Sequence, residues 1–268
     1  MTETKVRPNS RISKFPKFIW PLLCFLREKV LARVISKLLM RPNLYPYHFD
    51  LVATNNNTDF METAEFKKSY LAFKKAYGWD PGLPWRVHQF MWAVDQTQNL
   101  KGDWVEAGVG RGGLMSAALA HSANWNESGR VLHLFDTFLP WKLDADGIQS
   151  LSNMPTTYYA ENLEATKLNF SKYERVEFHV GDVFETVTTE ILDSISFLSI
   201  DLNWNIPEEH VLRTFWPKIQ IGGVVILDDY AAPSRVAQRI TMDKLSIELN
   251  FNILRTPSGQ GIIIRTGE

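Results

Sequence analysis

From residue 103 onward, short runs of apolar and β-branched residues alternate with longer segments of helical periodicity. The apolar runs cover residues 104–107, 131–135, 176–180, 195–200 and 224–227. Short buried strands separated by helices are typical of βαβ units, which pair in parallel. Two final runs, 251–254 and 261–265, are joined by a link too short for a parallel crossover. We predict an α/β fold with a doubly wound, mostly parallel sheet and an antiparallel last strand.

The first hundred residues carry a different pattern. Residues 1–21 place three prolines among Lys and Arg, which predicts a flexible basic arm. Residues 22–41 have apolar positions at helical spacing with basic residues between them, which predicts an amphipathic basic helix. Residues 63–77 resume a helical pattern, and we assign its aromatic residues to the core. The predicted organisation is an arm (1–21), a helical region (22–100) and an α/β domain (101–268).

Charge is distributed unevenly along the chain. The 268 residues have a net charge of −1, whereas residues 1–41 hold ten Lys and Arg against two Glu. Three surfaces remain candidates to cover the basic helix: its own domain, a second subunit in a homo-oligomer, or a membrane surface. The split does not indicate a nucleic-acid groove. Cys24 is the only cysteine, which fits a reducing, cytoplasmic setting, and the apolar run 19–26 is too short to span a bilayer.

A glycine-rich loop follows the first predicted strand, with Gly108, Gly110, Gly112 and Gly113 ahead of a helical segment. Glycines let the backbone turn sharply and approach a ligand closely. In open parallel sheets, ligands bind outside the carboxyl ends of the strands, where this loop lies. The spacing also satisfies the dinucleotide fingerprint, so the loop alone does not separate a nicotinamide enzyme from a methyltransferase.

Acidic residues at three successive strand ends favour the methyltransferase. Glu106 would repel a pyrophosphate but suit a ligand with a cationic amino group and a sulfonium. Asp136 is placed to accept both hydroxyls of an adenosine ribose, and Asp182 to accept from an adenine amino group. Any one of them alone is often only a helix cap. We predict S-adenosylmethionine as cofactor, bound by Glu106, Gly108, Gly110, Gly112, Asp136, Thr137, Gly181 and Asp182.

The fourth and fifth predicted strands also end in aspartates, Asp201 on one and Asp228 with Asp229 on the other. Adjacent parallel strands end side by side, so we expect these carboxylates to converge and to hold Mg²⁺ or another divalent cation. The fifth strand must break at Asp228, because neighbouring residues of a strand face opposite ways. Alternatively, one aspartate caps a helix and another is protonated or hydrogen-bonded. A cation here would lower the pKa of an acceptor hydroxyl.

Three segments together resemble the macrocin O-methyltransferase family: 105–113, 134–140 and 215–230. Members of that family methylate sugar or phenolic hydroxyls in antibiotic biosynthesis. The resemblance covers residues 103–265 and implies a seven-stranded, Rossmann-like class I methyltransferase core behind an N-terminal helical extension. It also implies magnesium on Asp201, Asp228 and Asp229, and a mobile lid from Thr137 to Pro155 that contains Trp141.

The chain departs from the family pattern after the fourth strand, where Asp201, Asn203 and Trp204 stand in place of Asp-x-Asp-x-Tyr. Asn203 can hold a metal or a hydroxyl, but it cannot accept a proton. The general base is then Asp201, His210, or the metal with solvent. We expect acceptor contacts from Trp141, Asn203, Trp204 and Tyr230.

The predicted function is Mg-dependent O-methylation of a sugar or phenolic hydroxyl on a small-molecule or glycan acceptor. Two alternatives stay open: a nicotinamide-dependent oxidoreductase, and a non-catalytic subunit that binds S-adenosylmethionine. The carboxylates after strands four and five have no role in hydride transfer, which disfavours the oxidoreductase. The basic helix leaves peripheral contact of a cytoplasmic enzyme with a membrane as a further expectation.

Overall fold

The computed structural model describes residues 47–49, 52–54, 56–138 and 163–267. The predicted arm (1–21), the basic helix (22–41) and most of the predicted lid, including Trp141, lie outside these residues. Strands β1 (Tyr47–Phe49) and β2 (Val52–Thr54) form a separate two-stranded sheet. The residues from Thr58 onward belong to one unit, which carries the rest of the fold.

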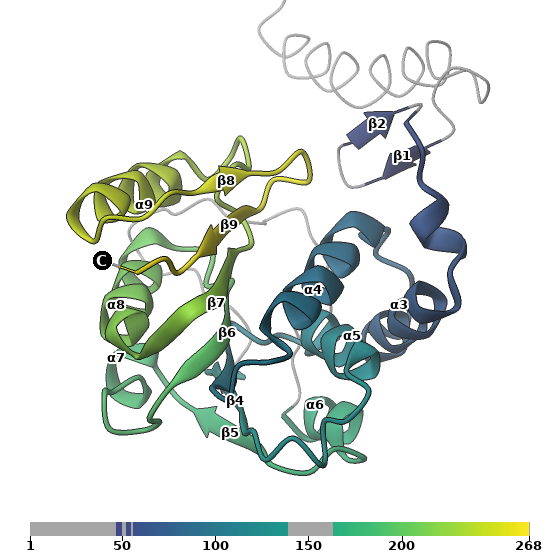
Figure 1. Cartoon of the computed structure of the whole chain (residues 1–268), viewed down its shortest axis with the longest axis horizontal. Coiled ribbons are helices and arrows are strands. Elements are labelled where there is room, and N and C mark those ends of the chain that lie inside the picture. Colours follow the sequence, from purple (N-terminus) through teal and green to yellow (C-terminus); the bar gives the residue numbers. More distant parts are fainter. Residues whose placement is uncertain (1–46, 50–51, 55, 139–162, 268) are drawn as a thin grey trace, which may run out of the picture. The chain divides into compact units, whose positions relative to one another are not determined.

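Seven strands form the main sheet, in the order β5-β4-β3-β6-β7-β9-β8 (Figure 1). Strands β3 to β7 pair in parallel, and β9 runs antiparallel to both β7 and β8. The predicted fold class and the antiparallel last strand are therefore confirmed. The strands are β3 (Asp103–Ala107), β4 (Leu132–Asp136), β5 (Val176–Val180), β6 (Ile195–Ile200), β7 (Ile219–Leu227), β8 (Leu254–Arg255) and β9 (Gly261–Ile264).

The direction of winding reverses between β3 and β6. The chain proceeds from β3 to β4 and β5 on one side, and from β6 to β7 on the other. Backbone hydrogen bonds continue just past the strand ends: Asp201 N donates to Ala107 O at 2.8 Å, and Asp228 N donates to Ile200 O at 3.0 Å. The loops after β3, β6 and β7 therefore begin side by side, at the point where open α/β sheets bind ligands.

Helices cover both faces of the sheet (Figure 1). One apolar core lies between the sheet and α3–α6, and a second lies between the sheet and α7–α9. Alternate residues of each strand serve the two cores, because side chains alternate across a strand. The helices are α3 (Ala64–Tyr77), α4 (Pro84–Thr97), α5 (Gly113–His121), α6 (Leu163–Phe170), α7 (Val183–Thr186), α8 (Asn205–Phe215) and α9 (Val236–Glu248), with 3-10 turns at Asp59–Glu62 and Trp216–Lys218.

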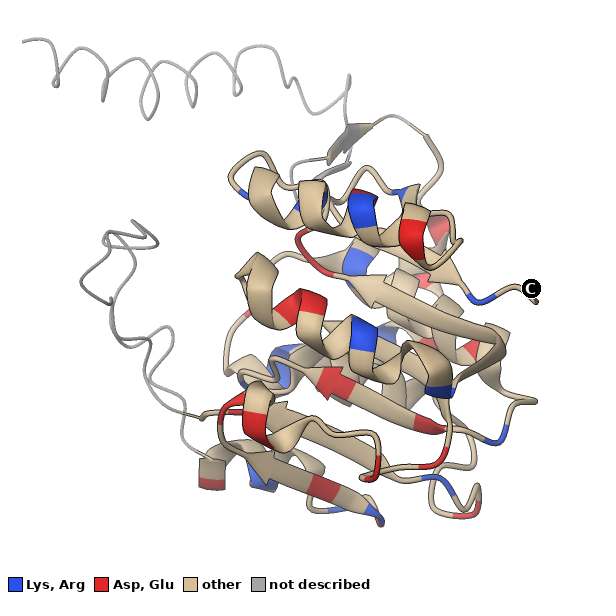
Figure 2. Ribbon diagram, turned by 90° about the vertical axis from the view of Figure 1, so that its left-hand side faces the viewer, with Lys and Arg blue, Asp and Glu red and all other residues tan. Residues whose placement is uncertain are grey.

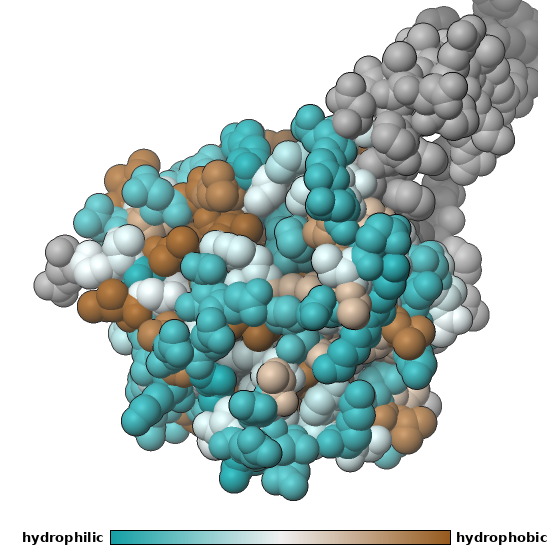
Figure 3. All heavy atoms as spheres, turned by 45° about the vertical axis from the view of Figure 1, so that its right-hand side comes forward, coloured by the Kyte–Doolittle hydropathy of each residue, from teal (hydrophilic) through white to brown (hydrophobic). Residues whose placement is uncertain are grey.

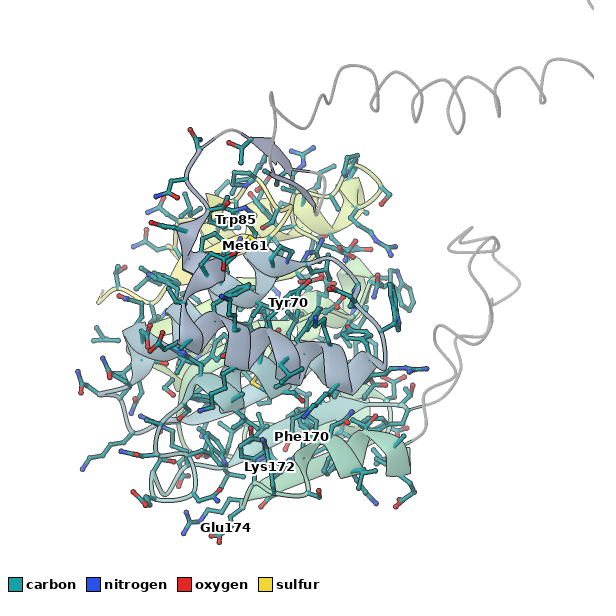
Figure 4. The ribbon with its side chains drawn as sticks, turned by 90° about the vertical axis from the view of Figure 1, so that its right-hand side faces the viewer. Met61, Tyr70, Trp85, Phe170, Lys172 and Glu174 are labelled. Atoms are coloured by element: carbon teal, nitrogen blue, oxygen red, sulfur yellow. The ribbon has the colours of Figure 1, made fainter. Side chains whose placement is uncertain are left out.

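Helix α3 begins and ends where its local sequence dictates. The side chain of Thr63 caps the helix by accepting from Phe66 N at 3.2 Å. Gly78 ends it in the left-handed conformation (φ 79°), which glycine adopts without steric cost. Its aromatic residues pack into the first core, as predicted: Phe66 and Phe73 are buried, and Tyr70 (labelled in Figure 4) packs against Phe73 at 5.6 Å between ring centroids.

Polar residues cover most of the face drawn in Figure 3. Acidic and basic residues are interspersed over the helices in Figure 2. Among the described residues, no helix is both long enough and apolar enough to cross a membrane.

Replacement of Phe73 by alanine tests the packing of α3 against α5. Phe73, on α3, is fully buried in the first core. Phe73→Ala should therefore lower the free energy of unfolding by about 3–5 kcal/mol in urea denaturation. Leu71, on the same helix and 49% exposed, supplies the control: Leu71→Ala should change the stability little. Equal effects of the two substitutions would contradict this packing.

Candidate active site

A cleft of about 530 Å³ opens at the carboxyl ends of the parallel strands. Its size is typical of pockets that bind small molecules and cofactors. Predicted site residues from five strand ends meet in its lining, namely Gly108, Gly110, Asp136, Thr137, Gly181, Asp182, Asp201, Asn203, Trp204, Asp228 and Asp229. The sequence did not point to other lining residues. Among these are Arg86 and Arg235, which form ion pairs with Asp228 and Asp229.

The glycine loop is shaped by contacts within the protein as well as by the cleft. Gly108 has φ 87°, and a Cβ atom there would lie 1.9 Å from the backbone oxygen of Asp201. A side chain at this position would therefore push β3 and β6 apart. Gly112 (φ 70°) faces the ring of Phe170, labelled in Figure 4, which a Cβ atom would meet at 2.4 Å. The absence of a side chain at Gly112 thus lets the loop pack against α6, and its predicted cofactor contact stays a prediction.

Asp136 organises the same loop. Its Oδ2 accepts hydrogen bonds from Val109 N at 2.8 Å and Gly110 N at 2.9 Å, and its Oδ1 accepts from Phe138 N at 2.8 Å. Both carboxylate oxygens therefore hold backbone in place at the rim of the cleft. The predicted ribose contact stays a prediction, and the support of the loop is a second role that the sequence spacing did not indicate.

The loop after β5 joins the cleft through Gly181 and Asp182. Gly181 N donates to Asp136 O at 3.0 Å, which ties this loop to the end of β4. Asp182 caps α7, with its Oδ1 accepting from Phe184 N at 3.0 Å. Helix capping and adenine recognition are compatible for a carboxylate with two oxygens, and the adenine contact remains a prediction.

The aspartates after β6 and β7 are compensated by arginines. Strand β7 ends at Leu227, so the chain turns at Asp228 and Asp229, as predicted. Asp228 forms an ion pair with Arg86 of α4 and accepts from Gln260 Nε2 at 2.6 Å. Asp229 forms an ion pair with Arg235, next to α9, at 3.2 Å.

The three carboxylates share the lining of one cleft. Arg86 of α4 pairs with Asp228, and Arg235 at the start of α9 pairs with Asp229. Metal binding at this site stays a prediction.

Burial and neighbouring carboxylates raise the pKa values of two acids near the strand ends, Asp201 and Glu106. Desolvation, followed by the charges of Asp228 and Asp229, raises the pKa of Asp201 well above its usual range. Burial and the charges of Asp136 and Asp228 do the same to the pKa of Glu106. Glu106 is only 3% exposed, and its Oε2 has no hydrogen-bond partner among the described residues. Glu106 is not among the residues that line the cleft, and its predicted contact with a cationic amino group stays a prediction.

Asn203 links Asp201 to Arg235, the arginine that pairs with Asp229. Its Nδ2 donates to Asp201 Oδ1 at 3.2 Å, while its side-chain and backbone oxygens accept from Arg235. The residue has φ 59°, a left-handed conformation that asparagine tolerates. At the position where the family pattern has a second aspartate, Asn203 of this chain forms hydrogen bonds to both Asp201 and Arg235.

Four predicted residues that the structure describes lie outside the lining of the cleft: Glu106, Gly112, His210 and Tyr230. His210 is on α8 and packs against Phe184 with 4.9 Å between ring centroids. Tyr230 is buried in the second core and donates to Asp243. The predicted roles of His210 as a base and of Tyr230 as an acceptor contact stay predictions. Trp204 lines the cleft and is 40% exposed.

The sheet order, the antiparallel last strand and the cleft at the reversal of winding define a Rossmann-like class I methyltransferase fold. The chain belongs to the macrocin-O-methyltransferase (TylF) family, whose model matches residues 85–255. More than half of the chain therefore matches, from the start of α4 to the end of β8.

Individual relatives agree with this assignment. The demethyldecarbamoylnovobiocin O-methyltransferase of Streptomyces niveus is 32% identical over 146 residues, which cover 49% of this chain and 54% of the relative. The match thus spans about half the length of that relative. The solved O-methyltransferase NovP has a TM-score of 0.58 at 22% identity, covering 73% of this chain and 88% of NovP. The calicheamicin methyltransferase CalS11 has a TM-score of 0.53 at 16% identity, covering 80% and 99%. Both structures show the shared fold.

Loss of the Asp136 carboxylate should loosen the glycine loop. Asp136→Ala removes the acceptor of three backbone N–H groups, so we expect a loss of about 1–3 kcal/mol in the free energy of unfolding. Hydrogen exchange should show faster exchange at Val109 and Gly110. Unchanged exchange in this loop would contradict the supporting role of Asp136.

Glu208, on α8, gives the fold a pH dependence. Burial raises its pKa to about 8, although Gln238 Nε2 donates to it at 2.7 Å. A carboxyl whose pKa is raised in the folded state stabilises the fold below its unfolded pKa of about 4.5, and this contribution is lost as the pH rises toward 8. Relative to Glu208→Gln, the wild type should therefore lose roughly 1–4 kcal/mol between pH 5 and pH 8 in chemical denaturation. Glu209→Gln, at the partly exposed neighbouring position, should show no such difference.

Proposed function

We propose that this protein is an S-adenosylmethionine-dependent O-methyltransferase that acts on a hydroxyl of a sugar or phenolic small molecule or glycoconjugate. The observation that carries the proposal is the single cleft where the glycine loop meets Asp136, Asp182 and Asp201. Membership of the macrocin-O-methyltransferase family supports it. The names of the relatives, which act in novobiocin and calicheamicin chemistry, support an acceptor of the natural-product type.

The cofactor would lie across the ends of β3, β4 and β5. Asp136 and Asp182, which line the cleft at the ends of β4 and β5, would accept from the ribose hydroxyls and the adenine amino group. The loop at Gly108 and Gly110 provides a backbone surface without side chains for the methionine part. The sulfonium would then face Asp201, whose negative charge stabilises a cationic ligand.

Methyl transfer is a displacement in line with the sulfur–carbon bond. The acceptor oxygen attacks the methyl carbon, the carbon–sulfur bond breaks, and its electron pair stays on sulfur as S-adenosylhomocysteine forms. The hydroxyl proton must leave as the new bond forms. We assign its acceptance to Asp201, because a carboxylate with a raised pKa is a better proton acceptor near neutral pH, and Asn203 has no basic atom.

A divalent cation would complete the charge balance of this cleft. Asp201, Asp228 and Asp229 contribute three carboxylates, and Arg86 and Arg235 pair with two of them. Hard oxygen ligands of this kind suit Mg²⁺. When bound, such a cation lowers the pKa of an acceptor hydroxyl. Because Arg86 holds Asp228 at α4, its side chain would have to move for Asp228 to become a ligand.

The acceptor would contact the apolar side chains of the cleft lining, which include Trp204, Pro207 and Leu83. Apolar and aromatic side chains suit the faces of a sugar or phenol ring. Trp204 is 40% exposed, so a ring stacked on it would bury apolar surface that is now in water.

Methyl transfer from radiolabelled S-adenosylmethionine to a panel of deoxysugar nucleotides and phenols tests the proposal. We expect transfer that chelator abolishes and Mg²⁺ restores. Asp201→Asn should lower kcat by about 10²–10⁴-fold, while calorimetry should show S-adenosylmethionine affinity changed only a few-fold. Asp193→Asn, at an exposed position, should leave both values unchanged.

Three results would contradict the proposal in different ways. Binding of NAD(H) but not of S-adenosylmethionine would support an oxidoreductase. Binding of S-adenosylmethionine without transfer to any acceptor would support a non-catalytic subunit, which the bridge from Asn203 to Arg235 would then explain. Methyl transfer that does not change with chelator would contradict the role of the divalent cation but would still support methyltransferase activity.

A further inference from the structure

Two histidines and a glutamate meet on the edge of the sheet away from the cleft lining. His133 is on β4, and Glu177 and His179 are on the edge strand β5, where His133 pairs in register with Glu177. Of the described residues, this is the set of His, Cys, Asp and Glu side chains whose ligand atoms lie close enough together to hold a metal ion. The three are outside the lining of the candidate active site, and the proposed methyl transfer gives them no role.

The ligand atoms have the spacing of a metal coordination sphere. His133 Nδ1 lies 3.0 Å from His179 Nε2 and 3.6 Å from Glu177 Oε2, and the last two atoms are 3.9 Å apart. A circle through three points with these separations has a radius of about 2.1 Å. Zinc binds imidazole nitrogen and carboxylate oxygen at about 2.0–2.2 Å, so one ion fits between the three atoms without moving the strands.

A carboxylate lies beside the buried histidine. Asp103 Oδ1 accepts from Val131 N at 2.8 Å, and its Oδ2 lies 3.5 Å from His133 Nε2, which has no hydrogen-bond partner among the described residues. Histidines that bind metals commonly direct their other ring nitrogen to a carboxylate, which fixes the tautomer. His133 is 3% exposed, and a proton on its Nε2 leaves a lone pair on Nδ1, the nitrogen that faces His179 and Glu177.

We propose that His133, Glu177 and His179 bind Zn²⁺, with Asp103 orienting His133, and that the ion joins β4 to the edge strand β5. Two imidazoles and a carboxylate suit zinc, whereas Mg²⁺ prefers oxygen ligands alone. The Glu177 side chain is 56% exposed, so an ion can enter from solvent and keep a water as fourth ligand.

The two imidazole rings must adjust for the ion to bind. They differ by 17° in plane, with centroids 5.2 Å apart, so the two nitrogens face each other edge to edge in a hydrogen bond. Zinc would replace that hydrogen bond, and both rings would turn toward Glu177. The ring of His179 stacks on Phe135 at 4.3 Å, which keeps the ring close to its present plane as it turns.

Zinc titration of tag-free, chelator-treated full-length protein tests the site. We expect calorimetry to show a zinc site with a micromolar or lower Kd, distinct from any cation bound by the carboxylates of the cleft, and thermal denaturation to show a higher Tm with zinc. His179→Ala and Glu177→Gln should each weaken the affinity at least about 10-fold, and Asp103→Asn about 10-fold. His121→Ala, which removes a histidine paired with Asp95 elsewhere, and Asp201→Asn, in the cleft, should leave the affinity unchanged.

Substitution of Co²⁺ provides a readout that does not depend on stability. Bound to this site, Co²⁺ should show the visible absorption of a tetrahedral complex, and His179→Ala should abolish it. Zinc affinity that is the same in the wild type, His179→Ala and Glu177→Gln would overturn the proposal. Binding weaker than millimolar, or loss of zinc binding in Asp201→Asn alone, would overturn it as well. None of these readouts depends on methyl transfer, so the proposed function can fail without affecting this test.

Discussion

The repulsion between carboxylates at the ends of the central strands is the constraint on which the site depends. Parallel pairing brings Asp201 and Asp228 to the same edge of the sheet, because backbone hydrogen bonds keep the ends of β6 and β7 in register. Such a cluster is stable only if cations or protons compensate it. The structure supplies Arg86 from α4 and Arg235 from the start of α9. Ion pairs therefore hold α4 and the start of α9 against the loop that follows β7.

Contacts at the same edge of the sheet also fix the backbone conformation of the glycine loop after β3. The approach of Gly108 to the backbone oxygen of Asp201 leaves no room for a side chain, and Asp136 holds the next two residues of the loop through their N–H groups. These contacts lie within the protein and hold the loop at the end of β6. A loop held by such contacts lowers the ordering cost of binding a cofactor.

Much of the fold followed from the sequence because strand alternation and parallel pairing are local and geometric. The start of β7 was not predicted correctly. The strand begins at Ile219, but Gly222 and Gly223 suggested a break before Val224. In the structure both glycines lie within the strand, near an irregularity in its register with β6. The strand-end aspartates were correctly placed at the cleft, since strands that pair in parallel end together, but Glu106 is not in its lining.

The orientation of side chains beyond the strand ends was not predictable. Tyr230 turns into the core and His210 packs on α7, because these directions depend on neighbours distant in sequence. Arg86 and Arg235 were missed for the same reason, although the need to balance three carboxylates pointed to such cations. Asn203 was recognised as a departure from the family, but its bridge to Arg235 required the structure.

A crystal structure of the protein with S-adenosylhomocysteine tests the central claim most directly. We expect the ribose at Asp136, the adenine at Asp182 and the sulfur on the side of Asp201, all within the cleft at the ends of β3 to β6. A nucleoside bound elsewhere, or one whose sulfur points away from Asp201, would contradict the account.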